Sequence, residues 1–382
     1  MVVGLSLIEG SAFAFLISTT QKLSRADDGL SSTNSDTSSR ESTIDIKPTN
    51  TAVRFVLSID GGGVRGVIPA RILQEIEERT KKPVHELFDL IIGASTGSIL
   101  ALGLVTPSSE RGGAKYTAAE MKEMYQEYSK ETFKSSFWNR GPLGVVRNLF
   151  VPKYRRDKLD KFLKLKFGNV TLSKTLAPVI CPSYSIDDSL PRSWMSNRTN
   201  ADVAQVLSDP LGGYDAFLRD VAGASSSAPT YFAPKIIVAN GVPLHEADGG
   251  LWANNPEILA CEWLKSSEQH NSKVIMVSLG TGKANETPSI VRAIGGAGLW
   301  GWLVKANLID IIISAESEWS DALSNYLFDK RYRLQVPLSR LSGMDDSTSK
   351  NMEAMIRGTE EYLKGDGESL VNAVCEELLR AR

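Results

Sequence analysis

An α/β fold with a mainly parallel central sheet is predicted by the order of apolar runs and glycine turns along the chain. The strand-like run Arg54–Ile59 leads through glycines to a helical pattern over Pro69–Arg79, and the run Leu90–Ile92 leads through glycines to another over Ser98–Leu104. A third core strand is expected at Val274–Leu279. Successive β-α units place their strands parallel, so both glycine turns should meet at the carboxyl edge of the sheet.

The first glycine turn is Asp60-Gly61-Gly62-Gly63-Val64-Arg65-Gly66. The backbone N–H groups of such a loop, placed before a helix, can converge on an anion. The spacing also matches a dinucleotide-binding fingerprint, but Thr80-Lys81-Lys82-Pro83 stands where a ribose-binding acid is expected. A phosphate loop is excluded as well, because no Gly-Lys-Ser/Thr follows. An anion cradle is therefore favoured over a cofactor site or a plain tight turn.

The second glycine turn, Gly93-Ala94-Ser95-Thr96-Gly97, matches the pattern G-x-S-x-G. A serine at such a strand-to-helix corner is held clear of the backbone, and the flanking Gly93 and Gly97 leave room for it. The pattern also arises by chance in chains rich in Gly and Ser, but the strand before it and the helix after it are the context that it requires. Ser95 is therefore the candidate nucleophile, and a serine beside a row of N–H donors suits acyl transfer.

Two assignments of the base for Ser95 stay open on the residues alone. The chain order of α/β-hydrolases would give a triad of Ser95, Asp248 and His270. His270 lies in a helix-to-strand turn, which belongs at the opposite edge of a parallel sheet, and His85 and His245 are no better placed. In the alternative, Asp248 itself takes the proton, which requires partial burial and direct contact with the hydroxyl.

The composition is that of a globular protein without a global basic charge. The chain has 382 residues, of which 42% are hydrophobic, enough for a substantial core, and its formal net charge of −2 gives no global attraction to nucleic acid. Its 3 cysteines, Cys181, Cys261 and Cys375, are scattered without paired spacing, and it has only 3 histidines. We therefore expect neither a disulfide framework nor a metal site.

The chain is expected to consist of an N-terminal extension over residues 1–50 and a catalytic domain over residues 51–382. Residues 27–50 are rich in Ser, Thr, Asp and Asn, which is typical of a disordered linker. Residues 2–18 are largely apolar, but Glu9 and Gly10 interrupt them and leave too short a run to span a bilayer. We expect a cytoplasmic or peripheral-membrane location, with a secretory route left open.

Aromatic and basic side chains are interleaved between Phe133 and Lys158, where Trp138 and Phe150 stand among Arg140 and Arg147. Such a mixture suits a lipid-water interface. A loop whose apolar residues cover the core while its charges are solvated would have the same composition. Peripheral contact with a membrane is expected on the first interpretation.

Four motifs follow one another along the chain: the loop Asp60–Gly66, the turn Gly93–Gly97, the small-residue segment Ala224–Phe232 and the turn Asp248-Gly249-Gly250. In these motifs the chain resembles the patatin-like phospholipases, both the plant-type patatins and their bacterial relatives. The resemblance covers roughly residues 53–365, and Leu279-Gly280-Thr281-Gly282 adds to it. The resemblance does not extend to the N-terminal extension, and it implies no role for these residues.

The resemblance implies a three-layer αβα fold and calcium-independent hydrolysis of acyl esters in phospholipids and galactolipids, with no cofactor. At the matching positions Ser95 is the nucleophile, Asp248 is the base and the N–H groups of Gly61, Gly62 and Gly63 form the oxyanion hole. The supporting positions are Arg65, which would brace the glycine loop, and Gly93, Gly97 and Gly249.

The predicted function is therefore that of a lipid acyl hydrolase of the phospholipase A type, acting on membrane lipids or lipid micelles. The alternative is a lipid-binding or regulatory module of the same fold with a weak or dormant site. Head-group preference and oligomeric state stay open.

Overall fold

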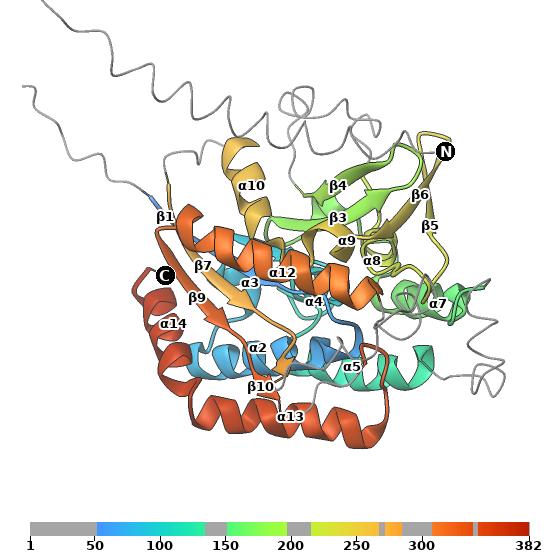
Figure 1. Cartoon of the computed structure of the whole chain (residues 1–382). Helices are drawn as coiled ribbons and strands as arrows, with labels where there is room; N and C mark the ends of the chain where they lie inside the picture. The colour runs from blue at the N-terminus through green and yellow to red at the C-terminus, as the bar shows by residue number, and fades with distance from the viewer. Residues whose placement is uncertain are drawn as a thin grey trace, which may run out of the picture. The chain divides into compact units, whose positions relative to one another are not determined.

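A computed structural model describes residues 52–133, 151–196, 215–266, 272–284, 308–338 and 343–381. At its centre is an eight-stranded sheet in the order β5-β6-β3-β2-β1-β7-β9, with β4 paired to β3 (Figure 1). The strands of this sheet are β1 (Val53–Ile59), β2 (Leu90–Gly93), β3 (Val179–Ser185), β4 (Leu190–Met195), β5 (Lys235–Ala239), β6 (Val242–Asp248), β7 (Lys273–Leu279) and β9 (Lys330–Leu334). Strands β8 (Lys283–Ala284) and β10 (Pro337–Leu338) form a separate pair. The expected boundary at residue 50 stays a prediction.

The centre of the sheet is parallel, as the sequence predicts. Strands β3, β2, β1, β7 and β9 are parallel neighbours, whereas β4, β6 and β5 join at one end in antiparallel fashion. The last residue of β1, Ile59, pairs with the last residue of β2, Gly93. The two glycine turns therefore leave the sheet side by side at its carboxyl edge.

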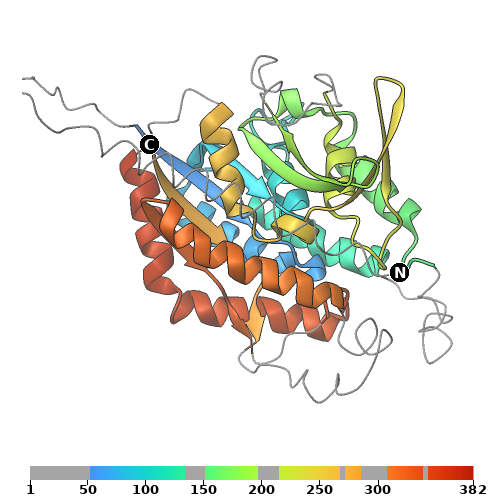
Figure 2. The ribbon, with the colours of Figure 1, turned by 45° about the horizontal axis from the view of Figure 1, so that its top comes forward.

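Helices cover both faces of the sheet, which gives three layers (Figures 1 and 2). Side chains of β1 alternate accordingly: Phe55, Leu57 and Ile59 enter one apolar core, and Val56 enters the other. The first face carries α2 (Val67–Thr80), α3 (Val84–Leu87), α4 (Thr96–Val105), α5 (Ala118–Thr132), α7 (Arg156–Phe167), α8 (Leu218–Ser225), α13 (Ser349–Lys364) and α14 (Glu368–Ala381). The second face carries α9 (Gly250–Ala253), η5 (Pro256–Leu259), α10 (Ala260–Ser266) and α12 (Leu308–Leu327). The short helices η1 (Gly63–Gly66) and η3 (Leu172–Lys174) lie in connections.

Helix α4 is the most deeply placed element on the first face. All of its residues are buried, because its sequence is apolar all around the helix rather than on one stripe. Its position fixes the corner from which Ser95 projects. In the described ranges, no helix combines the length and the hydropathy needed to cross a bilayer.

Candidate active site

Ser95 occupies the corner between β2 and α4 with φ 51° and ψ −119°. This backbone conformation is costly for a residue with a side chain and persists where the surrounding structure enforces it. A Cβ atom on Gly93 would collide with the carbonyl of Gly97, and one on Gly97 would collide with the carbonyl of Ile59. Glycine is therefore required at both flanking positions, and the turn presents the Ser95 hydroxyl to the space above the sheet.

Strand β3 aligns the strands that carry the two reactive residues. One side of β3 is occupied by β4, so β2 and β6 both pair with the other side. Strand β2 reaches Ile180 through Ile92, and β6 reaches Ser183 through Asp248. Because β2 and β6 run in opposite directions, their carboxyl ends point toward each other along β3.

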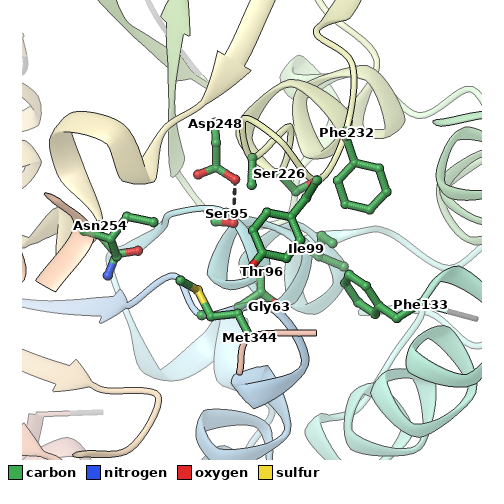
Figure 3. A pocket seen from close by; sticks show the side chains of 14 residues that line it. Gly63, Ser95, Thr96, Ile99, Phe133, Ser226, Phe232, Asp248, Asn254 and Met344 are labelled. Carbon is green, nitrogen blue, oxygen red and sulfur yellow. Dashed lines mark hydrogen bonds between the residues drawn. The ribbon is translucent and has the colours of Figure 1, made fainter. Parts of the chain in front are cut away.

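Ser95 and Asp248 meet at this junction (Figure 3). The Ser95 hydroxyl donates to Oδ2 of Asp248 over 2.8 Å, and the Gly250 N–H donates to Oδ1 over 2.7 Å. Asp248 is only 3% exposed, and no lysine or arginine within the described ranges forms an ion pair with it. Burial therefore raises the pKa of Asp248 to about 7, although both hydrogen bonds oppose the shift. A carboxylate in this state can accept a proton near neutral pH.

The carboxyl end of α8 holds both reactive residues by their backbones. The Ser225 hydroxyl accepts a hydrogen bond from the Ser95 N–H over 3.1 Å. The carbonyls of Ser225 and Ser227 accept from the N–H groups of Gly249 and Asp248, each over 3.1 Å. The small-residue segment predicted to lie beside the site thus positions it, a role that the sequence pattern does not assign to Ser225.

The glycine loop lies on the opposite side of Ser95 from α8. The Gly61 N–H donates to the carbonyl of Asn254 over 3.0 Å, so this group is already engaged. The N–H groups of Gly62 and Gly63 have no acceptor among the described residues, and both glycines line the same pocket as Ser95. Two of the three predicted donors are therefore available to an anion at the Ser95 hydroxyl.

Two contacts from outside the loop and one within it hold the loop in place. The Thr281 hydroxyl donates to the carbonyl of Gly61 over 2.8 Å, which gives the predicted motif at Gly280–Gly282 a structural purpose. Arg65 Nε donates to the carbonyl of Gly62 over 3.2 Å. The Val64 N–H donates to the carbonyl of Met344 over 2.8 Å.

A buried charge cluster lies beneath the loop. Asp60, which follows β1 and opens the loop, accepts from Arg333 through both carboxylate oxygens, with 2.9 Å between Oδ1 and Nη1. Arg333 also donates to the Ser278 hydroxyl over 2.7 Å. Its neighbour Arg331 contacts both oxygens of Glu257 over 2.6 and 2.8 Å. The cluster anchors the loop to β7 and β9.

Glu316, on α12, holds the residue that engages Gly61. Its Oε2 accepts from the N–H groups of Asn254 and Asn255 over 2.6 and 3.0 Å. The Asn254 side-chain amide donates to the Ser317 hydroxyl over 2.7 Å. Burial raises the pKa of Glu316 to about 7. No local pattern in the sequence indicates this contact, because the residues it joins are separated by 62 positions.

The pocket above Ser95 is walled mainly by apolar side chains (Figure 3). Those walls are formed by Ile99, Phe133, Ala228, Tyr231, Phe232, Ile313 and Met344. Next to the lining residue Met344, Asp345 accepts from Lys153 and from the Tyr154 hydroxyl. Phe133 belongs to the predicted aromatic and basic stretch, of which residues 134–150 lie outside the described ranges. The walls suit an acyl chain, which needs apolar surroundings beside the reacting ester.

None of the described histidines touches Ser95. His245 contacts Asp187 with 3.0 Å between Nδ1 and Oδ1, and His85 precedes β2 at the far edge of the sheet. His270 lies outside the described ranges. In those ranges, His, Cys, Asp and Glu form no group of three suited to a metal ion. The partner that the structure gives Ser95 is thus Asp248.

Comparison with known proteins places the chain in a family. Residues 57–260 match the family described as Patatin-like phospholipase. Patatin-like protein 2 of Arabidopsis thaliana is 30% identical over 354 residues, which cover 83% of this chain and 84% of that protein. Calcium-independent phospholipase A2-gamma of Rattus norvegicus is 33% identical over 235 residues, or 60% of this chain and 28% of that protein. The solved structure of VipD from Legionella pneumophila is 16% identical, with a TM-score of 0.36 over 85% of this chain and 67% of that one. From the family match and the Arabidopsis relative, this chain belongs to the patatin-like phospholipase family.

Proposed function

We propose that the protein hydrolyses fatty-acyl esters of membrane lipids, with Ser95 as nucleophile and Asp248 as base. The observation that carries the proposal is the 2.8 Å contact between the Ser95 hydroxyl and a buried carboxylate that has no cationic partner in the described ranges. A carboxylate paired with a cation would be a poor base, whereas one whose pKa lies near 7 is matched to the task.

In the acylation step, Ser95 Oγ attacks the ester carbonyl carbon while its proton passes to Asp248 Oδ2. The negative charge that develops on the carbonyl oxygen is stabilised by the N–H groups of Gly62 and Gly63, two residues that line the same pocket as Ser95. Asp248 then returns the proton to the leaving alcohol oxygen. In deacylation, water gives a proton to Asp248 as its oxygen attacks the acyl carbonyl carbon. Asp248 then returns this proton to Ser95 Oγ as the bond between Oγ and the acyl carbon breaks, which releases the fatty acid and restores both residues.

The substrate class is supported by the pocket and by the relatives. Ile99, Phe133 and Phe232 provide apolar walls next to the reacting serine. A relative named calcium-independent phospholipase A2-gamma supports phospholipids as the first class to test. The chemistry proposed above needs only groups of this chain.

The test is an assay of the purified protein on phospholipid, galactolipid and triacylglycerol, with Ser95→Ala alongside. We expect the wild type to release fatty acid from at least one lipid, and Ser95→Ala to lose about 10³-fold or more of that rate. His245→Ala is the matched control, because His245 stands on β6 three residues before Asp248 and its imidazole contacts Asp187. It should keep its activity, as should His270→Ala.

A lipid-binding module with a dormant site is the competing function. It would bind lipid equally well with and without Ser95 and release no fatty acid from any of the three substrates. Comparable losses in Ser95→Ala and His270→Ala would instead point to a triad and overturn the proposed roles.

A further inference from the structure

Helix α12 has the reverse of the usual polarity for a helix on the surface of a globular protein. Its inner face is polar: Glu316 binds backbone N–H groups, the Ser320 hydroxyl donates to the carbonyl of Asn255 over 2.7 Å, and Asp321 contacts Arg331. Ser320 and Ser324 are fully buried. A surface helix normally turns its apolar stripe inward and its polar residues outward.

The outer face of α12 is a continuous apolar stripe. Its members recur at intervals of three and four residues, which places them on one side of the helix. We call these residues the α12 stripe: Ile312, Ala315, Trp319, Ala322 and Tyr326. The large side chains of the stripe are 41%, 67% and 88% exposed for Ile312, Trp319 and Tyr326. Figures 1 and 2 show α12, in orange, along the outside of the second face with no other labelled element over it.

The α12 stripe lies on the same helix as one wall of the active-site pocket. Ile313, the neighbour of Ile312, lines that pocket together with Ser95. Glu316 and Ser317 hold Asn254, which lines it as well. An apolar surface on a helix that also lines a lipid site lies close enough to contact the same molecules that the site would process.

We propose that the α12 stripe docks the protein on a lipid bilayer and brings the pocket to its surface. The proposal depends on the function proposed above for the nature of the partner. Trp and Tyr are suited to this role because their rings are apolar and their N–H and O–H groups remain in the polar head-group layer.

The area of the stripe favours a bilayer over a second copy of the chain. One Ile, one Trp and one Tyr can bury roughly 500 Å² together. A stable dimer needs about 800 Å² on each partner. A bilayer needs no complementary surface, and a few inserted aromatic side chains are sufficient for reversible binding.

The test uses vesicles of phosphatidylcholine and the double variant Trp319→Glu/Tyr326→Glu. Binding is measured by co-flotation in the Ser95→Ala background, so that hydrolysis does not alter the vesicles. We expect the double variant to bind at least tenfold more weakly. When Ser95 is intact, the double variant should hydrolyse vesicle lipid at least tenfold more slowly than the wild type. Its rate on soluble p-nitrophenyl butyrate should stay within about twofold of the wild-type rate.

Leu165→Glu is the matched control, because Leu165 is 72% exposed on α7, on the other face of the sheet. It should bind vesicles like the wild type. Trp319→Ser and Tyr326→Ser, which introduce no charge, replace the double variant should it fail to fold, and each should weaken binding several-fold.

Unchanged vesicle binding in the variants would overturn the inference. The inference would also be overturned if the wild type is a dimer in solution and Trp319→Glu/Tyr326→Glu makes it a monomer, because the α12 stripe would then bind a second copy of the chain. Failure of the proposed function would give a different result. The wild type would then hydrolyse neither p-nitrophenyl butyrate nor lipid, while vesicle binding would still show whether the α12 stripe contacts a bilayer.

Discussion

Asp60 and Asp248 are two aspartates in the same kind of place with different properties. Asp60 directly follows strand β1 and Asp248 is the last residue of β6, and each is 3% exposed and lies beside a glycine turn. Asp60 has Arg333 on both of its oxygens, whereas the partners of the Asp248 carboxylate in the described part of the chain are the Ser95 hydroxyl and the Gly250 N–H.

The difference separates a structural carboxylate from a reactive one. Burial raises the pKa of both groups, but the charge of Arg333 opposes this at Asp60, and no charged group does so at Asp248. An ion pair keeps its carboxylate charged and unreactive, and breaking it is costly. A carboxylate held only by neutral donors keeps an affinity for a proton, which is what a general base requires.

The largest expected effect is that of Asp248→Asn. We expect ester hydrolysis to fall about 10³-fold, because the base is lost while the shape of the side chain is kept. Stability should not fall with it. Between the unfolded pKa of 3.8 and the folded value of about 7, the folded state holds a proton that the unfolded chain has released, so rising pH destabilises the wild type across this window.

At pH 8 the Asn variant escapes that penalty and should unfold at an equal or higher denaturant concentration than the wild type. Equilibrium unfolding at pH 5 and pH 8, beside the ester assay, measures both effects. A variant that loses activity only because it is largely unfolded would contradict the distinction between the two aspartates.

Asp60→Asn should lower stability more than activity, the opposite of Asp248→Asn. Removing the charge leaves Arg333 buried without its principal partner, which should lower the free energy of unfolding by about 3 kcal/mol. Activity of the molecules that remain folded should fall far less than in Asp248→Asn. Asp157→Asn is the matched control, since the Arg155–Asp157 pair is exposed and should contribute little to stability. Equal stability of the Asp60 and Asp157 variants would show that the Arg333 pair does not anchor the loop.

The smallest expected effect is on the pH profile. If Asp248 must be ionised to act, kcat/KM should fall about tenfold for each pH unit below a midpoint near 7. Glu316 also has a pKa raised to about 7, so it could produce the same limb. Glu316→Gln keeps an acceptor for the N–H groups of Asn254 and Asn255, and we expect it to retain the limb with at most a few-fold loss of rate. Disappearance of the limb in Glu316→Gln would assign it to α12 rather than to the base.

Local sequence patterns predict the glycine turns well, because the need for glycine arises within a few residues. The turn around Ser95 and the run of three glycines after Asp60 are recognisable for that reason, as is the parallel centre of the sheet. Strand β4 has no such signal, since Pro191 and Arg192 are atypical of a strand that pairs along its whole length.

Long-range contacts explain most of what the sequence does not reveal. Glu316 holds Asn254 in the position from which its carbonyl accepts from the Gly61 N–H. The hydrogen bond between Ser225 and Ser95 joins residues that are 130 positions apart. Helix α12 is hard to find in the sequence beyond Ile313, because polar residues follow and two of them, Ser320 and Ser324, are fully buried. A periodicity rule that assumes an apolar inner face cannot find such a helix.

The shared edge of β3 has a consequence for the tolerance of the site to change. The separation of the two reactive residues is set by the three-residue interval between Ile180 and Ser183, roughly 10 Å of strand. Lengthening the hairpin turn between β5 and β6 would leave this interval untouched. A shift of β6 by one residue would turn the Asp248 side chain to the other face of the sheet. The pairing of β2 and β6 with the same edge of β3 therefore fixes the distance between the reactive residues, and an insertion in the β5–β6 turn does not change it.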